Sequence, residues 1–510
     1  MFSNTHFNKL LILLFLVLFA MMQLFVKTSR LSLLPDPHYY VYEHSTNMVI
    51  VNGHLGVLRI TFDNFASSPG TVILKCFLSL VTGMDVLSIS FMEGLLAYLL
   101  FFLFVLLWLR SLYDNFSYII GVISLLSAGF TVISSPIFTY GSDAYLILLL
   151  ILVILSRVFK AKPLRAESII VLTIFTISMV VKYLPMGIYM LAVMLLLLFF
   201  LAILRVDLRH IKLVVLISFA TVSVYYVYIG HFFLGDFNAF IRTIIENIKF
   251  EQVQYTQRVV TTRIGYDPIY SFLYPLSLLR FTLIFLILTY SIVAFLIRKE
   301  PKIPHQVLAF NLLGSPLYIV GVITYVLVSS ISDYGTRIIS VSYAFYSTII
   351  YSVLLHIKYV KGNGSRLFII LRAGATLLVV LSMLGSISTP IALMYYEVKG
   401  FDWSTQYNYG QEGLWTSTFI KEVLDQSLLN KITGTYRYIY LFSRYGITHT
   451  ILYAKADVNN IANRDSLIVI PVGITKKPDA SFGPVSYEDL LRLMVSKGIV
   501  LNTGLSAIFK

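Results

Sequence analysis

The sequence predicts a polytopic α-helical membrane protein of about eleven transmembrane helices, followed by a small extracytoplasmic α/β domain at the C-terminal end. Of its 510 residues, 58% are hydrophobic and 13% are charged, and the mean hydropathy is +0.82. This number of charged residues is too small to form the surface of a soluble protein of this length. Lipid must therefore contact most of the exterior. The Lys and Arg residues lie in short groups between apolar runs. They indicate topology, because a nucleic-acid-binding protein would gather them on one basic face.

The predicted spans are apolar runs close to the 20 residues that cross a bilayer. We expect them near residues 10–26, 86–109, 118–137, 142–156, 168–183, 187–204, 213–230, 272–297, 306–331, 337–357 and 367–393. The first run follows Lys9 and lacks an A-x-A cleavage site after it. We therefore expect a retained first helix and not a cleaved signal peptide.

The charges between these runs predict the orientation in the plasma membrane. With the N-terminus in the cytoplasm, the inner loops are short and carry most of the Lys and Arg residues, as the positive-inside rule requires. The long outer segments are then residues 27–85, residues 231–271 and the chain after Tyr396. We expect a transmembrane domain at 1–396 and an extracytoplasmic domain at 397–510.

The outer segments have their own predicted elements. The apolar stretch Thr71 to Leu80 is too short to span, so we expect it along the membrane interface. Phe237 to Gln257 has the apolar spacing of an amphipathic helix. In the C-terminal domain we expect helices at 415–429 and 487–496, and strands at 448–454, 466–472 and 498–509.

The clearest candidate for chemistry is Asp36, in the segment Leu34-Pro35-Asp36-Pro37-His38-Tyr39-Tyr40. Prolines on both sides restrict the backbone and would hold the carboxylate near the membrane surface, which suits a general base. A simple turn is the alternative, because Asp and Pro are both frequent in turns.

Other candidates are ionisable groups in or near the spans. Glu93 and Arg280 lie at similar depths, so they could pair with each other or contact substrate. Arg337, at an outer helix end, could bind phosphate, anchor the helix at the interface or pair with Asp333. Asp143 lies in a predicted short outer connection.

Several site classes find no support in the sequence. No P-loop, HExxH, GxSxG or Ser/Lys catalytic pattern is present. The single cysteine, Cys76, excludes an intrachain disulfide and a CxxC metal site.

The order of these parts resembles the GT-C superfamily of membrane glycosyltransferases, in particular its divergent prokaryotic and archaeal members. The matching segments are Asp36-Pro37-His38-Tyr39-Tyr40, Gly53 to Gly56, Ser68-Pro69-Gly70, Leu80-Val81-Thr82-Gly83-Met84-Asp85 and Gly335-Thr336-Arg337. The resemblance covers most of the chain, through short motifs.

The resemblance implies transfer of a sugar from a polyprenyl-phosphate carrier to a glycan, lipid or protein acceptor at the outer face. It makes Asp36 the base and Arg337 the group that neutralises the leaving phosphate. Further candidate contacts for the substrate or its phosphate are Arg263, Arg258, His38, Tyr39 and Glu43. Asp143 matches an acidic motif that helps some relatives hold a divalent cation, Mg or Mn, but here it lacks the paired acid.

Two other functions stay open at this point. One is a non-enzymatic transporter or flippase for envelope glycolipid precursors, which would need polar groups along a path through the membrane. The other is an inactive GT-C-like assembly factor that presents its C-terminal domain to partners.

Overall fold

The structure is a computed structural model. It describes residues 38–58, 69–114, 116–128, 140–160, 166–206, 209–228, 305–327, 344–355 and 366–398, single positions between 272 and 289, Ser342, and the strand residues 432–434, 449–451, 467–471, 499–502 and 506–509. The chain divides into two compact units. Unit one takes Met1–Met21, Ala66–Gly70 and Leu96–Ala392, and unit two takes Met22–Phe65, Thr71–Leu95 and Leu393–Lys510.

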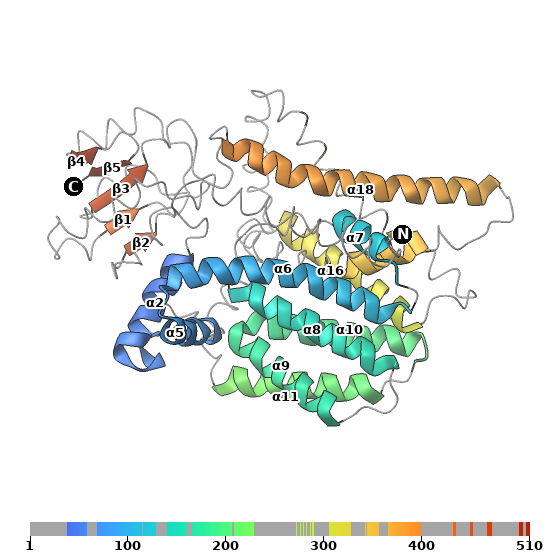
Figure 1. The fold of residues 1–510 in the computed structure, drawn as a ribbon, viewed down its shortest axis with the longest axis horizontal. Helices are drawn as coiled ribbons and strands as arrows, with labels where there is room; N and C mark the ends of the chain where they lie inside the picture. The colour runs from blue at the N-terminus through green and yellow to red at the C-terminus, as the bar shows by residue number, and fades with distance from the viewer. Residues whose placement is uncertain are drawn as a thin grey trace, which may run out of the picture. The chain divides into compact units, whose positions relative to one another are not determined.

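The described part of unit one is mainly helical (Figure 1). Its helices include α7 (Tyr118–Ser127), α8 (Tyr140–Lys160), α9 (Ala166–Lys182), α10 (Leu184–Ile203), α11 (Arg209–Tyr228), α16 (His305–Leu327) and most of α18 (Arg366–Val398). Helix α9 packs against α8, α10 and α11, and α10 also packs against α16. Among the described residues, the stretches Met186–Ile203 and Ile211–Tyr228 are long and apolar enough to cross a bilayer.

A polar and aromatic core holds unit one together. Trp108 is completely buried; its Nε1 donates to Ser156 Oγ at 2.9 Å, and its ring meets Phe310 and Phe345 edge-on. The hydroxyl of Tyr113 bonds to Ser352, which also accepts a hydrogen bond from Asn311 Nδ2 at 2.7 Å. These bonds satisfy polar groups that would otherwise be costly to bury.

The described residues of unit two form three helical parts and a sheet. The helical parts are α2 (His38–Asn52) with the short 3-10 turn η1 (Leu55–Val57), most of α5 (Gly70–Thr82) and the first residues of α6 (Val86–Leu112). Helix α6 continues into unit one.

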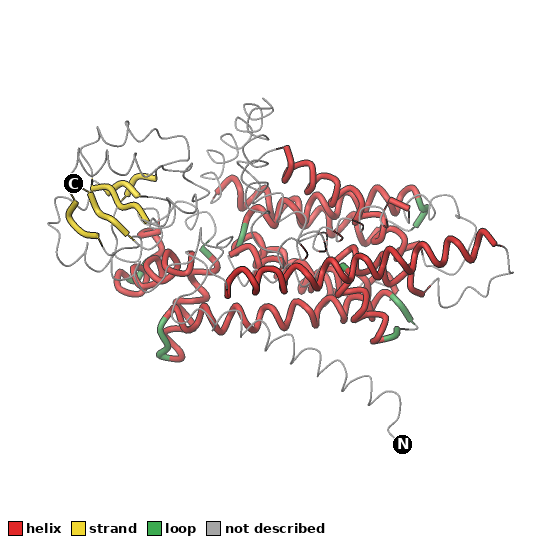
Figure 2. Tube along the Cα trace, turned by 90° about the horizontal axis from the view of Figure 1, so that it is seen from above, coloured by secondary structure: helices red, strands yellow, loops and turns green. Residues whose placement is uncertain are grey.

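The strands of unit two form one five-stranded sheet, drawn in yellow in Figure 2. They are β1 (Ile432–Gly434), β2 (His449–Ile451), β3 (Leu467–Pro471), β4 (Ile499–Asn502) and β5 (Ser506–Phe509), in the order β2-β1-β3-β5-β4. Strand β1 is parallel to β2 and β3, whereas β5 is antiparallel to β3 and β4.

Several predicted elements coincide with described ones. The runs at 86–109, 187–204 and 213–230 correspond to α6, α10 and α11, and the expected strands at 448–454 and 466–472 contain β2 and β3. The single strand expected at 498–509 is wrong: β4 and β5 divide it into an antiparallel pair. Strand β1 was not predicted.

The start of α8 also differs from the prediction. This helix has 21 residues and begins at Tyr140, so Asp143 lies in its first turn and not in a connection. The predicted first helix at 10–26, the amphipathic helix at 237–257 and the helices at 415–429 and 487–496 lie outside the described residues. The total number of spans and the domain boundary at residue 396 remain predictions.

Candidate functional site

The predicted site residues are covered unevenly by the structure. Asp36 lies outside the described residues, and α2 begins two positions later with His38 and Tyr39. Glu43 is a partly buried residue of the same helix. The four predicted arginines lie outside the described residues; they are Arg258, Arg263, Arg280 and Arg337. Their proximity to Asp36 therefore remains a prediction.

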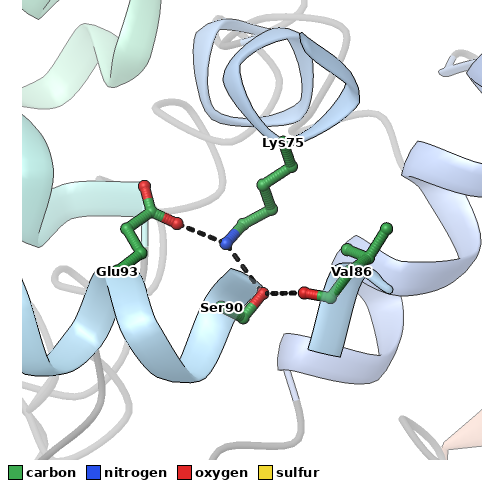
Figure 3. Close-up of polar contacts among 4 residues, drawn as sticks. All are labelled: Lys75, Val86, Ser90 and Glu93. Atoms are coloured by element: carbon green, nitrogen blue, oxygen red, sulfur yellow. Dashed lines mark hydrogen bonds and ion pairs between the residues drawn. The ribbon is translucent and has the colours of Figure 1, made fainter. Parts of the chain in front are cut away.

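Among the described residues, the most distinctive polar site is an ion pair between α5 and α6. The Lys75 side chain is 2% exposed and that of Glu93 is 15% exposed. Lys75 Nζ lies 2.5 Å from Glu93 Oε2 and donates to Ser90 Oγ at 2.8 Å (Figure 3). Ser90 Oγ in turn donates to the backbone oxygen of Val86 at 2.8 Å. We call Lys75, Ser90 and Glu93 the Lys75 cluster.

Helix α2 packs against the same part of α5. Lys75 Nζ lies 5.4 Å from the centre of the Tyr42 ring, a cation–π distance, and Tyr42 is completely buried. One turn further along α2, the backbone oxygen of Thr46 lies 3.7 Å from Cys76 Sγ. Two consecutive residues of α5 therefore contact two successive turns of one face of α2.

The connection between α5 and α6 is fixed by local hydrogen bonds. Gly83 has a φ of +69°, a left-handed conformation that favours glycine after a helix end, and its N–H donates to Ser79 O at 2.9 Å. Asp85 Oδ1 then accepts the Ser88 N–H at 2.9 Å, as an N-cap carboxylate does at a helix start. The segment Val81-Thr82-Gly83 therefore joins a helix end to a capped helix start.

The chemistry of the Lys75 cluster favours positioning over direct reaction. Glu93 already neutralises the ammonium group, and both groups are removed from bulk water. A buried pair gives little net stability, but loss of one partner leaves a costly buried charge. The cluster therefore constrains how α5 and α6 meet, and through Tyr42 it constrains α2.

Two titratable groups next to this cluster are shifted by burial. Burial raises the pKa of the Cys76 thiol, which keeps it protonated and unreactive near neutral pH. Burial lowers the pKa of His44 in α2, which favours its neutral form. Neither group has the character of an activated nucleophile or a positively charged phosphate ligand.

Sequence reasoning missed Lys75 and matched Glu93 with Arg280. Lys75 is a single cation inside the apolar stretch 71–80, and that isolation was the available signal. Arg280 lies outside the described residues, so a contact between Arg280 and Glu93 remains a prediction.

The binding of a divalent cation at Asp143 likewise remains a prediction. Within the described ranges, no group of three or more His, Cys, Asp and Glu residues could hold a metal ion. The side chain of Asp143 is not among those described.

Comparison with known proteins rests on structure alone. No family model and no curated protein matches the sequence. The fold is similar to that of ArnT from Cupriavidus metallidurans bound to undecaprenyl phosphate, with a TM-score of 0.50, 11% identity, and coverage of 99% of this chain and 98% of that chain.

Two further structures resemble the chain less well. The apo state of the same ArnT gives a TM-score of 0.41 and 10% identity, with 98% of each chain covered. The oligosaccharyltransferase AglB from Archaeoglobus fulgidus, in complex with an inhibitory peptide and a dolichol-phosphate, gives a TM-score of 0.45 and 12% identity over 92% of this chain and 70% of that chain. At 11% identity, the similarity to carrier-bound ArnT shows a shared many-helix fold, as the sequence predicted.

Proposed function

We propose that this chain is a GT-C membrane glycosyltransferase that moves a sugar from a polyprenyl-phosphate carrier to a glycan, lipid or protein acceptor. The observation that carries the proposal is the similarity to ArnT bound to undecaprenyl phosphate, which extends over 99% of the chain. Such a fold supports a location in the membrane. The distribution of Lys and Arg supports a cytoplasmic N-terminus in the plasma membrane, with the reaction and residues 397–510 on the outer side.

In the proposed reaction Asp36 is the general base. Its carboxylate takes the proton of the acceptor hydroxyl while that oxygen forms a bond to the anomeric carbon of the sugar. The bond between the anomeric carbon and the carrier phosphate oxygen breaks, and the phosphate leaves with the electron pair. Arg337 would pair with this phosphate, assisted by Arg263 or Arg258, because a guanidinium matches phosphate oxygens with two donors.

The described helices support the role of Asp36 as the base indirectly, through the helix that follows it. Asp36 precedes the first residue of α2 by two positions, and α2 is held against α5 at Tyr42 and Thr46. His38, Tyr39 and Glu43, all in α2, are candidate contacts for the acceptor or the sugar.

In this proposal, the candidate ligand of a divalent cation is Asp143. This residue lies in the first turn of α8, and the described residues provide no acidic cluster that would complete a site. Mg or Mn, if held there, would neutralise phosphate charge. We assign no step of the transfer to it.

The test is transfer by the full chain in lipid nanodiscs, supplied with undecaprenyl-phosphate-linked and dolichyl-phosphate-linked sugars and with membrane extract as acceptor. Asp36→Asn should lower the rate by at least about 100-fold, the usual contribution of a general base. Asp114→Asn is the matched control, because Asp114 is an exposed carboxylate beyond the other end of α6. Full transfer by Asp36→Asn would refute the assignment of the base.

The alternative functions give different results in the same system. Movement of the lipid-linked sugar across liposome membranes without any transfer would support a transporter or flippase. Neither transfer nor movement would support an inactive assembly factor. Either result would refute the proposed enzyme.

A further inference from the structure

The sheet of unit two has its parallel strands in a doubly wound order. Strand β1 is parallel to β2 and β3, and β4 runs in the same direction, because β5 is antiparallel to both β3 and β4. In the order β2-β1-β3-β5-β4, strand β2 lies on one side of β1, whereas β3 and β4 lie on the other side (Figure 1). When the antiparallel β5 is set aside, the order 2-1-3-4 is a common doubly wound order.

This order creates a topological switch point between β1 and β3. The chain leaves β1 toward β2, and it leaves β3 in the opposite direction, toward β4. Because crossovers between parallel strands are right-handed, we expect these two connections on opposite faces of the sheet. Where connections diverge in this way, open α/β sheets bind their ligands outside the carboxyl ends of the strands.

The register identifies the described residues at this edge of the sheet. Gly434, the last residue of β1, pairs with Ile451 of β2 and with Val469 of β3. Strand β3 continues to Pro471, which pairs with Ser506 of β5. The central strand therefore ends in a glycine, and a ligand can approach its backbone closely because no side chain is present there.

The chain that follows β1 provides a guanidinium group close to this edge. Arg437 is the third residue after Gly434 and lies outside the described residues. Chain length still limits its Cα to within about 11 Å of the Gly434 Cα, because each residue spans at most about 3.6 Å. Its neighbours are Tyr436 and Tyr438. A guanidinium matches phosphate oxygens with two donors, and a tyrosine offers an apolar ring face and a hydroxyl, which suit a sugar ring.

The chain that follows β3 adds two ammonium groups. Lys476 and Lys477 are the fifth and sixth residues after Pro471, so the Cα of Lys476 lies within about 18 Å of the Pro471 Cα. The first six residues after β1 and the first six after β3 include no Asp or Glu. After β2, Lys455 and Asp457 balance each other. The excess of positive charge on both sides of the switch point favours an anionic ligand.

We propose that the edge of the sheet outside Gly434 and Pro471 binds a phosphorylated sugar, with positive charge supplied by Arg437, Lys476 and Lys477. The phosphate would complement the cations, and the sugar ring would complement the tyrosines beside Arg437. Sugar phosphates and nucleotides share this chemistry. The proposal uses no residue assigned to the transfer reaction, so it does not rest on the proposed function.

The test is calorimetric titration of the full chain in a polyoxyethylene ether detergent, which contains neither phosphate nor sugar. The probes are glucose 1-phosphate, uridine monophosphate, glucose and inorganic phosphate. We expect one of the two phosphorylated probes to bind at least about 10-fold more tightly than glucose or inorganic phosphate, the effect of one hydrogen bond to a charged group. Tighter binding of uridine monophosphate would assign the site to nucleotides, and tighter binding of glucose 1-phosphate would assign it to sugar phosphates.

A pair of matched variants tests the location of the site. Arg437→Gln should weaken binding of the phosphorylated probe by about 10-fold or more. The control is Arg464→Gln, because Arg464 is the third residue before Leu467, where β3 begins at the opposite edge of the sheet. Arg464→Gln should leave the affinity unchanged, and an equal loss in both variants would overturn the proposal.

Two further results would also overturn it. One is the absence of binding of both phosphorylated probes at millimolar concentration, and the other is binding of inorganic phosphate as tight as theirs. Hydrogen exchange in the unmodified chain provides a second measurement, in case the variants do not fold. The bound probe should protect the amides that follow Gly434 and Pro471, and protection confined to other parts of the chain would contradict the proposal.

Discussion

Replacement of Lys75 by methionine would leave the Glu93 carboxylate beside an apolar side chain of similar length. Removal of one partner of a buried ion pair costs about 3–5 kcal/mol in the free energy of unfolding. We expect about 3 kcal/mol for Lys75→Met, because the Glu93 side chain keeps 15% exposure. Glu93→Gln should cost more, about 4 kcal/mol, because it strands an ammonium group on a side chain that is only 2% exposed.

The double variant Lys75→Met/Glu93→Gln distinguishes the charge from the packing. It removes both charges and keeps both side-chain volumes, so it should lie within about 1–2 kcal/mol of the unchanged protein. The coupling energy between the two sites would then be about 5–6 kcal/mol, above the usual range of about 0.5–3 kcal/mol. Ser90→Ala is the control, since it removes only one hydrogen-bond partner and should cost about 1 kcal/mol.

The assay is equilibrium unfolding in mixed micelles of dodecyl sulfate and dodecyl maltoside, followed by circular dichroism. All four variants and the unchanged chain are measured under one set of conditions. If Lys75→Met costs less than about 1 kcal/mol and shows no coupling to Glu93→Gln, the buried pair does not constrain α5 and α6 as we infer.

Three further predictions concern unit two and its connections. Gly83→Ala should lower the free energy of unfolding by about 1 kcal/mol. The cause is backbone strain at a φ of +69°, because nothing lies within 4 Å of the added Cβ. Gly374→Ala in α18 is the control: its added Cβ also has no close contact, but its φ is not positive, so it should cause no such loss. Asp85→Ala should cost about 1 kcal/mol by removing the cap of α6, whereas Asp85→Asn should retain most of it; equal losses would argue against capping. Burial lowers the pKa of His44 in the folded state. The contribution of neutral His44 to the free energy of unfolding should therefore be complete above the unfolded pKa, near 6.5, and should be lost as the pH falls through the folded pKa. Melting temperatures between pH 8 and 5 check this, and His44→Gln should weaken the dependence.

The helices that the sequence predicted well are those with long apolar runs. The predicted limits of α6, α10 and α11 lie close to the observed ones, because a helix surrounded by lipid needs apolar side chains along its whole length. The start of α8 was misplaced because Gly141, Ser142 and Asp143 are weak helix formers. In the first turn of a helix, however, an aspartate is favourable next to the positive end of the helix dipole.

The partner of Glu93 could not be read from the sequence. An acidic residue within an apolar helix indicates that a cation is nearby, but the choice between Lys75 and Arg280 depends on how two helices rotate and cross. The division of 498–509 into β4 and β5 had a local signal, Asn502-Thr503-Gly504, which is typical of a turn. Asp36 and Arg337 remain sequence predictions, since neither is among the described residues.

The neutrality of the Lys75 cluster bears on how the chain responds to the electrical potential across a membrane. A single charge displaced through the whole field changes in energy by about 2.3 kcal/mol per 100 mV. Lys75 and Glu93 carry opposite charges 2.5 Å apart, so the field acts on them as a small dipole and exerts almost no net force. We therefore expect α5 to keep its depth in energised and de-energised membranes alike, which spin-label depth measurements with and without an imposed potential would check. A lone lysine at the same position would be drawn along the field.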